Sequence, residues 1–180
     1  MNNVKKTVIS AMFLALGFIL PFLTGQIQQI GNMFLPMHIP VLLCSFICGW
    51  KYASVLGIIL PLLRSALFTM PVMYPNAVSM SVELLSYGFF ADFVYNHIKT
   101  KNIRGVYVSL AFAMVGGRIV WGIIQTILLG FGGNAFGFTA FISGAFLNAI
   151  PGIIIQLAFI PAIVVSFQKT DFLKEMKKNE

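Results

Sequence analysis

Charged residues are scarce in this sequence. Only 9% of the 180 residues are charged, with 12 lysines and arginines against five acidic residues, whereas roughly 25% are charged in a soluble domain. The chain therefore has too little polar surface to face water on all sides. Cysteine is equally scarce, since Cys44 and Cys48 are the two in the chain and lie within one apolar run. Two such residues are too few for a disulfide framework and fit small apolar core positions.

Motifs that carry chemistry are also missing. The sequence contains no G-x-x-x-x-G-K-[ST] phosphate loop, no G-x-S-x-G elbow and no H-E-x-x-H helix, so it offers no familiar ATP, nucleophile or zinc site. The two histidines, His38 and His97, fall on opposite sides of the membrane that the apolar runs described below are expected to cross. We therefore expect neither an enzyme nor a cofactor or metal, and uphill transport would need energy supplied by another chain.

Long apolar runs are what the sequence has instead. Apolar residues make up 58% of the chain, its mean hydropathy is +0.90, and runs of about 20 residues are long enough to cross a bilayer. We expect a single transmembrane domain over 1–180, an all-α bundle of six helices with a retained first span and a cytoplasmic tail at 168–180. The expected spans are 7–23, 37–49, 52–70, 77–96, 106–129 and 138–167.

The basic residues predict the orientation. With the N-terminus inside, ten of the twelve lysines and arginines fall on the cytoplasmic side, and the other two lie within spans. This is the positive-inside pattern of a multi-pass cell-membrane protein, with both termini cytoplasmic. A net charge of +7 distributed in this way does not indicate nucleic-acid binding. The ten are Lys5, Lys6, Lys51, Lys99, Lys101, Arg104, Lys169, Lys174, Lys177 and Lys178.

Three ionisable residues lie inside predicted spans, where a charge is costly and usually functional. Arg64, Glu83 and Arg118 all fall in the outer half or near the middle of the membrane, so they could meet. Their summed charge of +1 favours an anionic ligand. The alternative is that Glu83 and one arginine form an internal pair that only locks helices together.

Other polar residues share faces with these three. On the fifth span, Arg118, Trp121 and Gln125 recur with helical spacing and present a cation, a flat ring and an amide, which suits a pocket for a small polar molecule. Tyr87 lies on the Glu83 face of the fourth span, and Asn148 aligns with Gly144 and Gly152 on the sixth. Gln156, one turn further inward, is interpreted as interhelical packing.

The first outer loop combines amides with apolar residues. Asn32 and His38 flank Met33–Leu35, so this segment either closes over a pocket as a lid or is an ordinary connection. No second ligand residue lies at metal spacing from His38. Near the cytoplasmic end of the fourth span, we expect Asp92 to be solvated or paired with Arg104.

The first span contains Ala11-x-x-x-Ala15 within S-A-M-F-L-A-L-G. This element resembles the A-x-x-x-A motif in the first helix of the substrate-binding S components of energy-coupling-factor (ECF) vitamin transporters. The strings G-N-M-F-L-P-M-H-I-P at 31–40 and P-L-L-R-S at 61–65 are also similar to this family. With six spans in 180 residues, the resemblance covers essentially the whole chain.

The resemblance implies function and partners. S components bind a vitamin among the first outer loop and helices four to six, and work with a membrane coupling protein and two ATPases. In that scheme the Ala11 and Ala15 stripe docks on the coupling protein. The chain looks most like pantothenate members, although riboflavin, pyridoxine and cobalamin types share its general features. The arginine excess agrees with a carboxylate or with a phosphate.

Two other classes stay open at the level of sequence. A small membrane enzyme acting on a lipid would need an acidic cluster or an acid–base pair at the interface, and Asp92 has no acidic partner three or four residues away. A ligand-free accessory subunit would have all its intramembrane polar residues satisfied in pairs.

Overall fold

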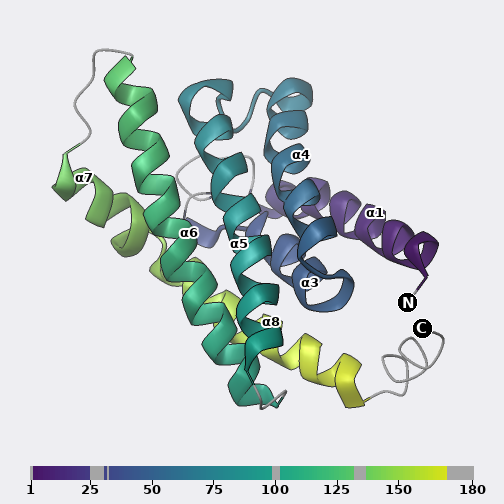
Figure 1. Ribbon diagram of the computed structural model, residues 1–180. Coiled ribbons are helices and arrows are strands. Elements are labelled where there is room, and N and C mark those ends of the chain that lie inside the picture. Colours follow the sequence, from purple (N-terminus) through teal and green to yellow (C-terminus); the bar gives the residue numbers. More distant parts are fainter. Residues whose placement is uncertain (1, 25–30, 32, 99–101, 132–136, 170–180) are drawn as a thin grey trace.

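The computed structural model describes residues 2–24, 31, 33–98, 102–131 and 137–169. These residues form a helical bundle without strands in the described part (Figure 1). The main helices are α1 (Asn3–Ile19), α3 (His38–Cys48), α4 (Trp50–Phe68), α5 (Val78–His97), α6 (Ile103–Phe131) and α8 (Ile150–Lys169). Shorter elements are η1 (Leu20–Thr24), η2 (Met73–Ala77), α7 (Phe138–Ile142) and η3 (Ser143–Leu147).

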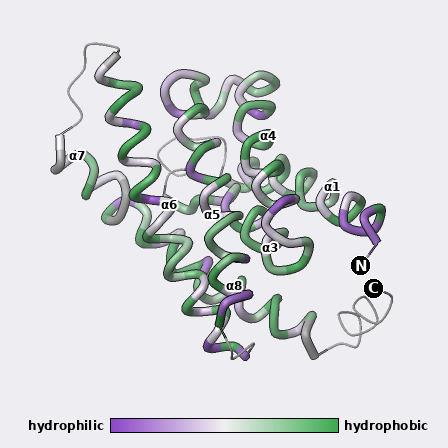
Figure 2. Tube along the Cα trace, viewed as in Figure 1, coloured by the Kyte–Doolittle hydropathy of each residue, from purple (hydrophilic) through white to green (hydrophobic). Residues whose placement is uncertain are grey.

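Five helical stretches are long and apolar enough to cross a membrane, and Figure 2 shows that hydrophobic residues dominate the bundle. The exception in length is α3, whose 11 residues span about 16 Å at 1.5 Å per residue, about half of a hydrocarbon core. Most of α3 is buried. It is an internal helix enclosed by its longer neighbours, and the all-α membrane fold is confirmed.

The centre of the bundle is α5, which packs against α3, α4 and α6. Its contact with α4 is close because both helices carry glycine there. A Cβ on Gly57 would lie 2.6 Å from the Leu84 carbonyl carbon, and one on Gly88 would lie 2.9 Å from that of Ala53. A hydrogen bond from α3 reaches the same region of α5, since Ser45 Oγ donates to the Gly88 carbonyl at 2.7 Å. Small residues thus hold α5 in a fixed position.

The helix at the edge is α1. It packs on α3 and α4, Gly17 is its one buried residue among those described, and it projects from the side of the bundle in Figure 1. Ala11 and Ala15 are both exposed. The stripe that the sequence associates with docking therefore lies on the surface.

Asp92 has a different role from the one expected. It is 8% exposed, and its Oδ2 accepts the Trp50 backbone N–H at 3.0 Å while its Oδ1 accepts from Asn96 at 2.8 Å. Asp92 was expected to be solvated or paired with Arg104, and the solvated alternative was wrong. The first N–H groups of α4 lack partners within the helix, and Asp92 accepts from one of them. A carboxylate there also interacts favourably with the helix dipole.

The predicted sixth span is not one continuous helix. The segment contains α7, η3, a turn at Asn148 and Ala149, and then α8. Pro151 lies in the first turn of α8, where its missing N–H is tolerated, but its ring opposes helix continuation from the preceding turn. The expected alignment of Gly144, Asn148 and Gly152 on one helical face is therefore lost.

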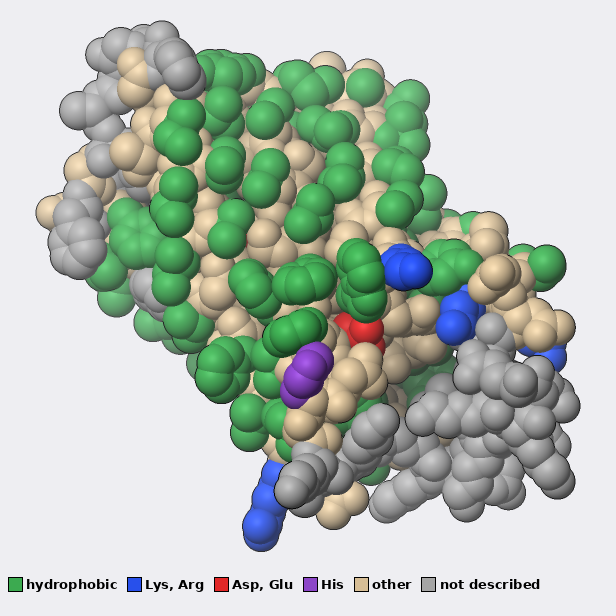
Figure 3. Space-filling model, viewed as in Figure 1, with side chains coloured by type: hydrophobic (Ala, Val, Ile, Leu, Met, Phe, Trp, Pro, Cys, Tyr) green, Lys and Arg blue, Asp and Glu red, His purple; other side chains and the backbone are tan. Residues whose placement is uncertain are grey.

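Charge is distributed unevenly along the bundle. In Figure 3, hydrophobic side chains cover the upper part of the visible face, while the visible Lys, Arg and His side chains are spread from its middle downward and to its right edge. The lower end holds the end of α5 and the start of α6 (Figure 1). The orientation predicted from the basic residues stays a prediction.

Candidate functional site

Three ionisable side chains from three helices meet inside the bundle. Glu83 Oε1 on α5 lies 3.0 Å from Arg118 Nη1 on α6 and 3.3 Å from His38 Nε2 at the start of α3. The exposed fractions are 2%, 4% and 0% for Glu83, Arg118 and His38. With a neutral histidine, the group has no net charge, which lowers the cost of placing it in an apolar interior.

The start of α3 is shaped so that His38 enters this group. Leu35 adopts a left-handed φ of 51°, and the His38 N–H donates to the Leu35 carbonyl at 3.1 Å. Pro36 and Pro40 flank the turn, and both are buried. Proline tolerates the first turn of a helix but not its interior, so α3 begins here.

The Arg118 guanidinium is only partly used by the protein. Nη1 contacts Glu83, whereas Nε and Nη2 are buried without a hydrogen-bond partner among the described residues. The Trp121 ring centroid lies 6.0 Å from the guanidinium carbon. The Tyr87 side chain lies next to the Arg118 guanidinium and interacts with it, and its ring packs edge-on against His38 at 4.9 Å. Arg118 thus combines an ion pair to Glu83 and a contact with Tyr87 with two donors, Nε and Nη2, that make no well-formed hydrogen bond to a described residue.

Two amide side chains add further unused groups. Gln125 on α6 is 6% exposed and Gln156 on α8 is 0% exposed. Gln125 Oε1 and both polar atoms of the Gln156 amide have no hydrogen-bond partner within the described ranges. Buried polar groups are normally paired, so this concentration marks a candidate binding site. We call His38, Glu83, Arg118, Gln125 and Gln156 the polar layer.

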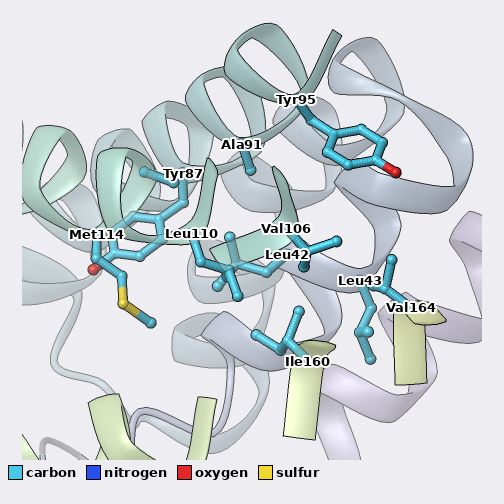
Figure 4. Packing of buried hydrophobic residues seen from close by; sticks show 11 residues of the cluster. Leu42, Leu43, Tyr87, Ala91, Tyr95, Val106, Leu110, Met114, Ile160 and Val164 are labelled. Atoms are coloured by element: carbon cyan, nitrogen blue, oxygen red, sulfur yellow. The ribbon is translucent and has the colours of Figure 1, made fainter. Parts of the chain in front are cut away.

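An apolar floor underlies the polar layer. Tyr87, Leu42, Leu110 and Met114 belong to one buried cluster with Ile160, and Figure 4 shows these side chains facing one another across the helices. The described members of the floor include no carboxylate and no basic side chain. A bound molecule would therefore make its ionic contacts with the polar layer and its apolar contacts with the floor.

Two segments pack against α8 and α6, the helices that carry Gln156 and Arg118. A Cβ on Gly152 would lie 2.6 Å from the Met33 carbonyl oxygen and 2.8 Å from that of Phe34, so the segment before α3 rests directly on α8. The Trp121 ring stacks on Phe141 with centroids 6.3 Å apart. A Cβ on Gly144 would lie 3.1 Å from Trp121. An aromatic residue of α7 therefore lies beside the Arg118 face.

Some of the residues expected at the site lie together in the structure, and others do not. Arg118, Glu83 and His38 meet, with Tyr87 and Trp121 beside them and Gln125 buried on the same helix as Arg118. Asn32 lies outside the described residues. Asn148 is exposed in the turn before α8, because the helix expected to turn it inward is broken there.

Arg64 does not join the group. Its Nη1 donates to the Phe18 carbonyl at 2.7 Å, and its guanidinium lies over the Phe22 and Phe68 rings at 5.0 and 5.2 Å. A cation at the C-terminal end of a helix interacts favourably with its dipole. Arg64 thus ties the end of α1 to α4, so the three ionisable residues, which could have met, do not all meet, and Glu83 pairs with Arg118 alone of the two arginines.

Gln156 is the polar-layer residue that its sequence pattern did not mark as a site residue. It was assigned to interhelical packing, yet its amide makes no hydrogen bond to a described residue. The available signal was position, because Gln156 lies one turn from Gly152 and one turn from Ile160 on the same inward face of α8. Among the described residues, no group of three His, Cys, Asp or Glu side chains is arranged to hold a metal.

Comparison with known protein families decides the class. The model of the family described as the ECF transporter substrate-specific component matches residues 5–164. The chain belongs to this family. Searches among curated proteins and among solved structures gave no significant match. As an S component, the chain is a membrane transporter subunit and not an enzyme, with a small-molecule substrate and the ECF module as its general partners.

Proposed function

We propose that this S component captures a vitamin, with pantothenate as the best candidate, on the outer side of the cell membrane. The observation that supports this is the polar layer, in which buried donors and acceptors from α6 and α8 lack described protein partners. A ligand-free accessory subunit would satisfy these groups internally, because each unpaired one costs about 1–3 kcal/mol.

The unused donors of Arg118, rather than the net charge of the layer, support an anionic substrate. Arg118 keeps Nε and Nη2 available, and these two adjacent donors form an edge that matches the two oxygens of a carboxylate. Pantothenate carries one carboxylate together with an amide and hydroxyl groups. Glu83 would stay on Nη1 at the opposite side of the guanidinium. In this proposal Arg118 serves at once as a helix lock and as a ligand contact.

We place both termini in the cytoplasm. The lysines and arginines support this orientation because ten of the twelve fall on the expected cytoplasmic side and no basic residue falls in an expected outer loop. The cytoplasmic end would then hold the α3–α4 and α5–α6 connections. The polar layer would open toward the outside.

The partners we propose are a membrane coupling protein and two ATPases, which release the substrate inward. The exposed Ala11 and Ala15 on α1 support close approach of another helix, because small side chains let helix backbones come together. Neither alanine lies in the polar layer. Docking and binding should therefore be separable.

Uptake tests the function and its partners together. Cells that express the chain with the coupling protein and ATPases should accumulate labelled pantothenate, and cells lacking any one of these components should not. Replacing Ala15 with Leu should abolish uptake while the purified protein still binds pantothenate. The control is Ala111→Leu on the exposed face of α6. Equal loss of binding in Ala15→Leu would place α1 in the pocket and contradict the assignment.

A further inference from the structure

We propose that Gln156 of α8 binds an uncharged hydrogen-bonding group of the substrate, an amide or a hydroxyl, beside the anionic group held by Arg118. This inference rests on the proposed function and assigns a substrate class to the site: a small anion with an uncharged polar arm. It also gives Gln156 a role in specificity.

The burial of Gln156 is the first observation. Its side chain is fully buried, and neither Nε2 nor Oε1 has a hydrogen-bond partner among the described residues. An amide that served only to join helices would bond to the neighbouring helix, since an unpaired buried amide weakens the fold. The Gln156 amide therefore has a donor and an acceptor that make no hydrogen bond to the described part of the protein.

The register of α8 against α3 places Gln156 at the level of the polar layer. At the outer end, Gly152 packs on the Phe34 backbone. Further inward, Ile160 and Leu42 belong to the same cluster, and Figure 4 shows both side chains in one region of the floor. Gln156 lies midway between Gly152 and Ile160, and His38 lies one turn before Leu42. The two helices run in parallel here, so this register places Gln156 at the level of His38 along the bundle.

The chemistry of the unused groups defines the substrate class. Arg118 offers donors only, so it selects an anion. Gln156 offers a donor and an acceptor side by side, which complement the acceptor and donor of an amide or the single O–H of an alcohol. A second anion at Gln156 would leave its Oε1 without a donor. The pair of side chains therefore recognises one charged and one uncharged polar group.

Stability gives the first test, which needs no substrate. Leu has a similar volume to Gln and no polar atoms, so Gln156→Leu removes the unpaired groups without creating a cavity. We expect the melting temperature of the detergent-purified, substrate-free protein to stay the same or rise. A clear fall would show that the amide joins helices, and it would overturn the inference. Ile154→Leu on the lipid-facing side of α8, where Ile154 is 61% exposed, is the matched control.

Binding gives the second test. The titrants are pantothenate and panthenol, in which an alcohol replaces the carboxylate. Gln156→Leu should weaken binding of both compounds at least tenfold, because both keep the amide and the hydroxyls. Arg118→Ala should weaken pantothenate far more than panthenol. Unchanged affinity of Gln156→Leu for pantothenate would overturn the inference even if the wild type binds pantothenate well.

Failure of the proposed function gives a different pattern. If the wild type binds neither compound, pantothenate is wrong as the substrate, and riboflavin, pyridoxine and cobalamin are titrated next. Loss of binding of whichever vitamin the wild type accepts, in Gln156→Leu but not in Ile154→Leu, would support the role of Gln156. If the wild type binds none of them, the melting temperature of Gln156→Leu decides: no fall supports the inference, and a clear fall overturns it.

Discussion

The Glu83–Arg118 pair allows the two proposed roles of Arg118 to be separated. The two side chains lie 3.0 Å apart and are almost fully buried. Removing one partner of a buried pair leaves an uncompensated charge, which costs about 3–5 kcal/mol. For a chain of this length, each kcal/mol corresponds to about 2–4 °C. Glu83→Gln should therefore lower the melting temperature by roughly 6–20 °C.

Affinity should follow a different pattern from stability. Arg118→Ala removes charge-assisted hydrogen bonds to the substrate, worth about 1.5–3 kcal/mol, so the dissociation constant for pantothenate should rise roughly tenfold to more than a hundredfold. Arg118→Lys should recover only part of this loss because a point charge cannot reproduce two parallel hydrogen bonds. Glu83→Gln should leave the affinity intact or raise it, since it removes a negative charge near the bound carboxylate.

The double variant completes the cycle. Combining Arg118→Ala with Glu83→Gln should restore much of the melting temperature, because no unpaired charge remains, while pantothenate affinity stays low. Both quantities are measured on the same detergent-purified samples by scanning fluorimetry and isothermal titration calorimetry. Stability rescue with unaltered affinity in every variant would show that Arg118 is only a helix lock, and it would refute the reasoning.

Three further predictions concern topology, packing and capping. In a background without the native cysteines, a cysteine at Thr69 should react with an impermeant thiol reagent on whole cells and one at Asn102 should not; the reverse result would invert the orientation. Gly152→Ala should lower stability by about 1–3 kcal/mol, the usual cost of overpacking, and weaken binding, because its Cβ meets the Met33 backbone at 2.6 Å. Gly130→Ala, with open space around it, is the control. Asp92→Ala should cost about 0.5–2 kcal/mol as a lost helix cap without altering affinity, and an unchanged melting temperature would contradict that role.

The fold was largely predictable because the features that mark its helices can be found along the sequence, without knowledge of which helices are neighbours. Apolar runs of membrane length mark the helices, and periodic spacing placed Arg118 and Gln125 on one inward face. Pro151 also indicated the break before α8, because proline disfavours the interior of a helix, although the expected span of 138–167 was continuous. Local rules of this kind need no knowledge of the neighbouring helices.

The membership of the site was less predictable because it depends on how helices rotate against each other. Arg64 and Arg118 have similar depths, and only packing decides that Glu83 pairs with Arg118 while Arg64 meets the end of α1. Likewise, His38 reaches Glu83 only because the chain turns at Leu35. Gln156 gave no sign in the sequence that its amide would lack a helical partner.

The account depends most on the polar layer being a binding site. Native mass spectrometry of the detergent-purified protein measures this directly by recording the mass of the intact chain with any bound small molecule. We expect one co-purified or added vitamin per chain in the wild type, with pantothenate giving the strongest adduct, and loss of this adduct in Arg118→Ala. A wild-type chain that binds no vitamin, or an adduct that survives Arg118→Ala and Gln156→Leu unchanged, would contradict the account.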